Sequence, residues 1–181
     1  MDPGVRRSED VSTTIAVPER TLDFDVLYRA ARDDVYAYVA TMLRDRAAAE
    51  DVTAQAFERA YRRRRGFDAR RGSPRAWLFG IARNAALDEL RHRRRGAELT
   101  AEPADPATPA PEDEAELALR RAAVRGALAV LEPRDRELIA LKFHAGLATA
   151  ELAAVLGVSE SNAGTRLHRA MQKLRKALDE S

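Results

Sequence analysis

The sequence predicts an all-α protein in which two small helical domains are joined by a flexible linker and the second domain contains a helix-turn-helix. Three observations predict this class. Apolar residues recur at helical spacing over 24–95, as at Val52 and Ala56, and no strand-like alternation persists. The stretch 96–114 has four prolines and no aliphatic periodicity. Near the carboxyl end, two short helical stretches meet at a turn centred on Gly157.

The composition limits the classes of protein that fit. The 181 residues are 45% hydrophobic but only 6% aromatic, which favours a core divided between small units. The chain has no cysteine, so disulfides, thiol nucleophiles and cysteine-ligated zinc are excluded. No apolar run approaches the length of a membrane span, and residues 1–14 lack the apolar core of a signal peptide. We therefore expect a cytoplasmic protein without membrane insertion.

The net charge of +2 conceals a strong segregation of charge along the chain. Residues 59–95 hold thirteen arginines against three acids, a balance of +10. Residues 96–118 hold seven acids and no base, and 164–178 return to +5. Such a pattern indicates an anionic partner that the chain meets at two separate places.

The organisation follows from these shifts in composition. Residues 1–20 are polar and aperiodic and are predicted to form a disordered amino-terminal segment. Residues 21–95 form the first helical domain. An acidic, proline-rich linker, extended and semi-rigid, occupies 96–114. The second helical domain takes up 115–181.

Four helices are predicted in or at the edge of the second domain, over 114–131, 133–145, 149–156 and 160–178. Pro133 suits the first position of its helix because it has no N–H to leave unpaired there.

The last of these helices has two faces at 100° per residue. Its apolar face, which we expect to pack against Leu152, Val155 and Leu156, consists of Ala163, Leu167, Ala170, Met171, Leu174 and Leu178. Its polar face consists of Asn162, Thr165, Arg166, Arg169, Lys173 and Lys176. In a helix-turn-helix the second helix enters the major groove, where arginine binds guanine and lysine neutralises phosphate. A solvated basic face on an ordinary helical hairpin is the alternative, but the Gly-Val-Ser turn favours DNA binding.

A second candidate surface lies in the first domain. Trp77, Asn84, Asp88 and Arg91 fall on one helical stripe within an arginine-rich segment. An aromatic ring, an amide and several guanidinium groups on one surface suit single-stranded nucleic acid. Taken alone the signal is weak, since a single tryptophan on a helix is more often a core residue.

Three segments together resemble the extracytoplasmic-function class of bacterial sigma factors. "AEDVTAQAFERAY" (49–61) is similar to the family's core-polymerase-binding helix, and "RAWLFGIARNAALDELRHRRR" (75–95) to its helix for the −10 promoter element. Residues 131–178 resemble its −35-binding domain. The resemblance covers most of 24–178.

The resemblance implies roles for particular residues. Asp51 and Gln55 would face the largest subunit of the core polymerase. The residues matching the surface that reads the −10 element are Phe67, Arg71, Ser73, Asn84, Asp88 and Arg91, with Trp77 supporting them from within. The residues matching the −35 reader are Lys142, Asn162, Thr165, Arg166, His168, Arg169 and Lys173.

The expected partners are the RNA polymerase core enzyme, promoter DNA both as duplex and as melted non-template strand, and, by the resemblance, an anti-sigma factor. An enzyme is not expected: His92, His144 and His168 are scattered and no glycine-rich phosphate loop is present. No catalytic residue, metal or cofactor is therefore predicted. The alternative function is a helix-turn-helix regulator that binds duplex DNA without core polymerase.

Overall fold

A computed structural model describes residues 22–97 and 115–180, and every regular element within these ranges is a helix. This confirms the predicted all-α class. The segment predicted to be disordered, 1–20, lies outside the described residues, as does the predicted linker 96–114 apart from its first two residues, which complete a helix. None of the helices described combines the length and the apolar character needed to cross a membrane.

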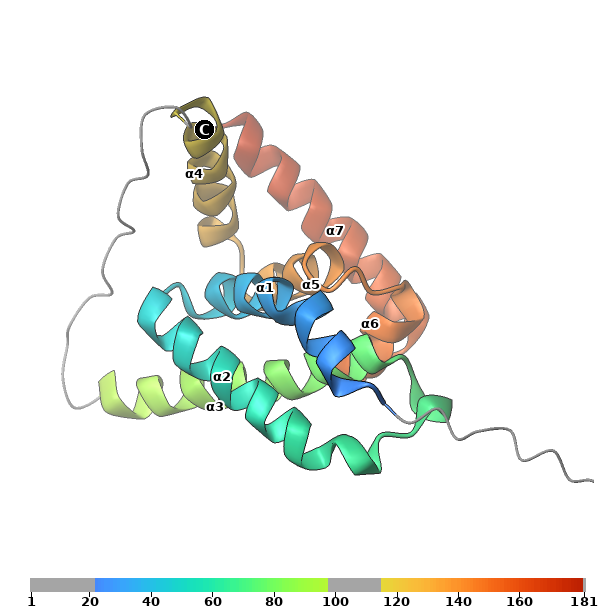
Figure 1. Ribbon diagram of the computed structural model, residues 1–181. Coiled ribbons are helices and arrows are strands. Elements are labelled where there is room, and N and C mark those ends of the chain that lie inside the picture. The colour runs from blue at the N-terminus through green and yellow to red at the C-terminus, as the bar shows by residue number, and fades with distance from the viewer. Residues whose placement is uncertain (1–21, 98–114, 181) are drawn as a thin grey trace, which may run out of the picture.

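The amino-terminal half contains three long helices and two single-turn 3-10 segments (Figure 1): α1 (Phe24–Leu43), α2 (Arg46–Arg63), η1 (Arg64–Gly66), η2 (Ala69–Arg71) and α3 (Pro74–Ala97). Asp23 starts α1 because its carboxylate accepts a hydrogen bond from the backbone N–H of Val26 at 3.0 Å. Arg44, in the left-handed conformation with φ 56°, ends the same helix.

Asp45 has a double role at the start of α2. Its carboxylate accepts from the backbone N–H of Ala48 at 3.0 Å and from the guanidinium of Arg93 in α3 at 2.9 Å. The Ala48 N–H, and after it Arg93, lower the pKa of Asp45. Because the folded pKa lies below the unfolded value, the stabilisation is present at neutral pH and is lost as pH falls through the folded pKa.

Asp45→Ala is expected to reduce the free energy of unfolding by about 1–2 kcal/mol at pH 7, since a helix cap is removed. Urea unfolding at several pH values measures this cost. The difference in free energy of unfolding between the variant and the parent should become smaller as the pH falls below about 4, near the ordinary pKa of aspartate. A cost that stays constant down to pH 3 would contradict the assignment to the ionised carboxylate.

The carboxyl-terminal half contains four helices: α4 (Ala115–Val130), α5 (Pro133–Phe143), α6 (Thr149–Leu156) and α7 (Glu160–Asp179). Gly157 ends α6 with a φ of 68°, which glycine adopts without steric cost, and Ser159 then caps α7 by accepting from the N–H of Asn162 at 3.2 Å. The predicted helix-turn-helix is thus α6 and α7.

The two faces predicted for α7 are present except at Leu178, which is 37% exposed near the end of the helix, and the apolar face has two different partners. Leu167 packs against the cluster that contains Leu152 of α6, as expected. Farther along α7, Ala170 and Leu174 are buried in a second cluster with Ile139 of α5 and with residues from the end of α4. Helix α7 is therefore fixed by three helices rather than by α6 alone.

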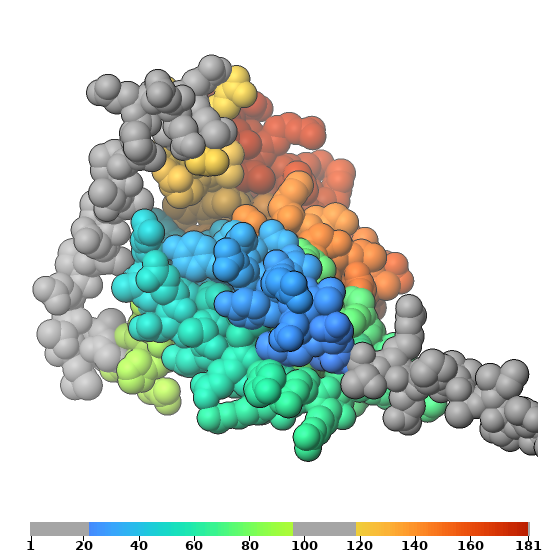
Figure 2. All heavy atoms as spheres, in the orientation of Figure 1, coloured from blue at the N-terminus to red at the C-terminus, as the bar shows by residue number. Residues whose placement is uncertain are grey.

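The two halves share one apolar core, whereas the composition had favoured a core divided between small units. Space-filling atoms of the halves meet without a gap on the face shown in Figure 2. Within the core, the rings of Tyr38 and Phe79 meet edge to face with centroids 5.7 Å apart. The fully buried members of this cluster include residues from both halves: Val35, Tyr38, Leu78, Phe79, Leu141, Leu147 and Leu152.

Candidate nucleic-acid-binding surfaces

A hollow of about 490 Å³ opens beside the first turns of α3. Phe67, Arg71, Trp77 and Asn84 are among the residues that line it, and we refer to it as the α3 hollow. The rings of Phe67 and Trp77 meet edge to face at a centroid distance of 5.5 Å. Trp77 is half-buried. One part of its ring system contacts Phe67, and the side chain also lines the hollow.

The other three residues predicted to read the −10 element lie outside the α3 hollow. The Ser73 hydroxyl donates a short hydrogen bond to the carboxylate of Glu151 in α6. Asp88 and Arg91 lie one to two turns beyond Asn84 in α3. Asp88 forms ion pairs with Arg91 at 3.0 Å and with Arg59 of α2 at 3.4 Å. The structure therefore gathers half of the predicted set in one place.

The polar face of α7 presents a compact set of side chains to solvent. Asn162, Thr165, His168 and Arg169 are all exposed. The His168 ring nitrogen Nε2 lies 3.0 Å from the amide nitrogen of Gln172 one turn later. Amide, hydroxyl, imidazole and guanidinium groups on adjacent turns offer the donors and acceptors that base edges in a major groove require.

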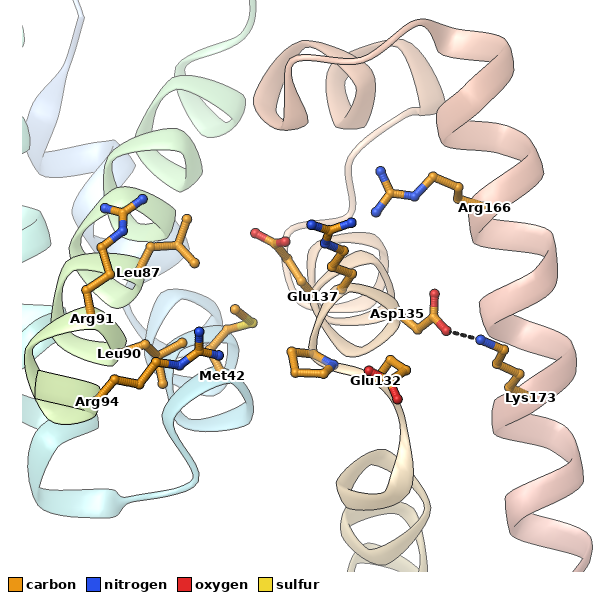
Figure 3. A pocket seen from close by; sticks show the side chains of 12 residues that line it. Met42, Leu87, Leu90, Arg91, Arg94, Glu132, Asp135, Glu137, Arg166 and Lys173 are labelled. Atoms are coloured by element: carbon orange, nitrogen blue, oxygen red, sulfur yellow. Dashed lines mark hydrogen bonds and ion pairs between the residues drawn. The ribbon is translucent and has the colours of Figure 1, made fainter. Parts of the chain in front are cut away.

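The remaining residues predicted for the −35 element contact or face other parts of the protein. Lys142 is half-buried, and its ammonium donates to the backbone carbonyl of Leu147 at 3.1 Å. Lys173 forms an ion pair with Asp135 of α5 at 2.5 Å, the dashed line in Figure 3. Arg166 points into the cleft between the halves rather than outward with Arg169.

That cleft has a volume of about 670 Å³ and runs between α3 and the helices α5 and α7. Figure 3 shows apolar side chains on one wall, from Met42, Leu87 and Leu90, and acidic side chains from α5 on the opposite wall. Guanidinium groups stand on both sides. The cleft lining therefore mixes apolar surface with charges of both signs.

Asp51 and Gln55 are both exposed on α2. They lie four residues apart, so their side chains share one face of the helix. That face is turned away from the apolar side of α2, where Val52 and Ala56 are buried.

Contacts between the halves were missed by reasoning from the sequence. Arg83 of α3 and Glu137 of α5 form an ion pair at 2.5 Å, with side chains only 22% and 8% exposed. In the sequence, Glu137 resembles any surface charge of a helix. The available signal was its position directly before the apolar residues 138–141, which are all buried.

Arg75 connects three helices. Its guanidinium pairs with Asp34 of α1 at 2.5 Å and donates to the backbone carbonyls of His144 and Ala145, at 2.8 and 2.5 Å, at the end of α5. The ring of His144 in turn lies 3.2 Å from the Thr41 hydroxyl. Burial lowers the pKa of His144 despite the opposing effect of Asp34, so this contact involves a neutral imidazole near pH 7.

Among the residues that the structure describes, no group of three or more potential metal ligands is placed to hold an ion. The α3 hollow offers aromatic and amide groups to an unpaired base, and α7 offers a polar face to a duplex. The fold and the chemistry of these surfaces are those expected of an all-α nucleic-acid-binding protein, with the α3 hollow and the polar face of α7 as its two candidate surfaces.

Comparison with known proteins places the chain in a family. Residues 27–96 match Sigma-70 region 2 and residues 121–174 match Sigma-70, region 4. The ECF RNA polymerase sigma factor SigL of Mycobacterium tuberculosis is 33% identical over 159 residues, covering 85% of this chain and 90% of SigL. The chain therefore belongs to the ECF sigma factors of the sigma-70 family and is a transcription initiation factor.

Two further relatives are also named as RNA polymerase sigma factors, and the aligned residues cover different shares of their chains. CarQ, an RNA polymerase sigma factor of Myxococcus xanthus, is 36% identical over 160 residues, which cover 87% of this chain and 90% of CarQ. The ECF sigma factor BldN of Streptomyces coelicolor is 35% identical over 158 residues, covering 86% of this chain. The aligned part spans 60% of BldN.

Two solved structures share the fold. The sigma factor RpoE of Bartonella quintana, in complex with the anti-sigma factor NepR, has a TM-score of 0.70 at 23% identity and covers 87% of this chain and 97% of its own. CnrH, in complex with the cytosolic domain of CnrY, has a TM-score of 0.63 at 26% identity and covers 87% of this chain and 88% of its own.

Proposed function

We propose that this chain binds the RNA polymerase core enzyme, directs it to promoters through −10 and −35 elements and so starts transcription of a specific set of genes. The observation that carries the proposal is that each family region presents one candidate surface: the α3 hollow in region 2 and the exposed face of α7 in region 4. The chain acts by binding alone, in the cytoplasm with the polymerase, and carries out no catalysis of its own.

In the −10 element, the α3 hollow would receive a base of the melted non-template strand. Its aromatic wall, formed by Phe67 and Trp77, suits stacking, and Asn84 can both donate to and accept from a base edge. Arg71, exposed at the rim, suits the phosphate backbone.

In the −35 element, α7 would lie in the major groove. Thr165, His168 and Arg169 are exposed on adjacent turns and would contact bases, and Asn162 lies at the amino-terminal end of the helix, where recognition helices contact base edges. Arg166 and Lys173 would contact phosphates only after their side chains turn out of the cleft between the halves. Lys142 would do so only after its hydrogen bond to the Leu147 carbonyl is broken.

Asp51 and Gln55 would contact the core polymerase from α2. An anti-sigma factor is a further proposed partner, supported by the structural relatives RpoE and CnrH, the first solved with an anti-sigma factor and the second with the cytosolic domain of CnrY.

Adding the purified chain to core polymerase and sequencing the transcript starts tests the proposal. New, chain-dependent starts that share upstream elements are expected. The regulator alternative predicts instead a footprint on duplex DNA without polymerase and no new starts. The match of 27–96 to region 2 disfavours that alternative.

Asn84→Ala is expected to impair promoter melting while −35 binding is retained, because the amide would contact only the unpaired strand. A lost base contact costs about 1–3 kcal/mol. Permanganate reactivity of unpaired thymines measures the melting. Arg169→Ala is the matched variant, and it should weaken duplex binding instead. Equal melting by Asn84→Ala and the parent would remove Asn84 from the reading surface.

A further inference from the structure

The cleft between α3 and the helices α5 and α7 is lined by more cations than its carboxylates neutralise (Figure 3). Asp135 is paired with Lys173, and Glu137 is paired with Arg83 of the adjoining interface. Glu132 is the remaining carboxylate of the lining. The other cations of the lining therefore share a single carboxylate within the part of the chain that the structure describes.

Three guanidinium groups of the lining form no ion pair with any residue that the structure describes. They belong to Arg94 of α3, Arg134 in the first turn of α5 and Arg166 of α7. Figure 3 shows Arg94 on one wall of the cleft and Arg166 on the other. Unpaired cations from three helices thus surround one cavity.

An anion would relieve the repulsion between these groups. Positive side chains gathered around one cleft repel each other, and apolar walls strengthen their field because they lower the local dielectric constant. Leu87 and Leu90 form such a wall on the side of Arg94. The amino terminus of α5 also lines the cleft, no side chain caps it, and the start of a helix adds partial positive charge.

The arrangement indicates the chemical class of the anion. Guanidinium groups bind phosphate through paired hydrogen bonds, and a chain of linked phosphates reaches arginines on both walls more readily than a single phosphate does. The apolar wall can cover a base. A cleft of about 670 Å³ also lies within the size range of small-molecule sites, roughly 300–1,000 Å³.

We infer that this cleft binds a nucleoside polyphosphate, whose phosphates pair with Arg94, Arg134 and Arg166 and whose base lies against Leu87 and Leu90. The site is separate from the α3 hollow, and the inference does not depend on the proposed function. Because the ligand contacts both halves of the folded chain, its binding stabilises the fold. The stability of the protein then depends on the concentration of the nucleotide.

Binding of ATP, AMP and inorganic tripolyphosphate to the purified 181-residue chain tests the inference, by isothermal titration calorimetry at fixed ionic strength. ATP should bind at least tenfold more tightly than AMP, which has one phosphate, and more tightly than tripolyphosphate, which has no base. At about 100 times its Kd, ATP should raise the Tm by about 5–10 °C.

Arg94→Ala, Arg134→Ala and Arg166→Ala should each weaken ATP binding at least tenfold, because each removes a charge-assisted contact to phosphate. Their Tm without ATP should stay near that of the parent, since no ion pair is lost. The matched control is Arg175→Ala, which removes the same side chain from an exposed position of α7 outside the cleft and should leave ATP affinity unchanged. Arg169→Ala examines the polar face of α7 in the same way.

Equal affinity for ATP and AMP, or equal weakening by Arg175→Ala and Arg134→Ala, would indicate unspecific attraction of anions and overturn the inference. Weakening by Arg169→Ala alone would place ATP on the face proposed to read DNA, with the same consequence. Absence of ATP binding by the parent would also overturn it. If binding then appeared once the seven acids of 96–118 were replaced by their amides, the cleft would belong to that acidic stretch instead.

Discussion

Asp51→Arg is expected to abolish co-purification with core polymerase while leaving the fold intact. The carboxylate is exposed on α2, on the face that the family resemblance assigns to the polymerase. Reversing its charge would set two cations against each other if the partner surface is basic, at a cost of about 3 kcal/mol, or roughly 100-fold in affinity. Pull-down with tagged core enzyme measures the loss.

Asp179→Arg makes the same charge change at the exposed end of α7, far from α2 along the chain, and should bind as the parent does. Circular dichroism and thermal unfolding would verify that both variants fold. Unchanged polymerase binding by a folded Asp51→Arg variant would mean that the polymerase contacts another face, and the role of Gln55 would be in doubt with it.

Phe79→Ala is expected to destabilise the protein by about 3–5 kcal/mol, which is a large part of the stability of an ordinary domain. The side chain is 0% exposed, contacts Tyr38, and lies in the core that both halves share. Its removal leaves a cavity that rigid helices on either side cannot close. Urea unfolding followed by circular dichroism measures the change.

Phe143→Ala is the matched control, since the same atoms are deleted from a side chain that is 62% exposed. Its effect should stay within about 0.5 kcal/mol. Equal destabilisation by the two substitutions would contradict the shared core as the source of stability.

Local features of the sequence determined the helices. Spacing of residues such as Val52 and Ala56 predicts which face of α2 is buried, and both are buried. Gly157 and Ser159 mark the end of α6 and the start of α7, because glycine adopts the left-handed conformation without steric cost and the serine hydroxyl accepts a hydrogen bond from the first turn of α7. These signals act within a few residues, so they can be recognised without knowing the fold.

The candidate surfaces were predictable in part for the same reason. Helical spacing places Trp77 and Asn84 on one stripe, the family resemblance adds the loop before α3, and the structure brings Phe67, Arg71 and Asn84 around one hollow. Asp88 and Arg91 lie on the same stripe, but intramolecular ion pairs use their charges. Spacing places a side chain on a face but does not reveal its partner.

By itself, the sequence determined the helical class, the helix-turn-helix and the family, because periodicity, capping and motif order are written in neighbouring residues. Only the tertiary structure decided that α6 lies on the α3 hollow and that Arg83 meets Glu137. These residues are 54 positions apart. Their pairing depends on how two apolar faces dock, and a pattern of hydrophobic residues shows that a face is buried without showing against what.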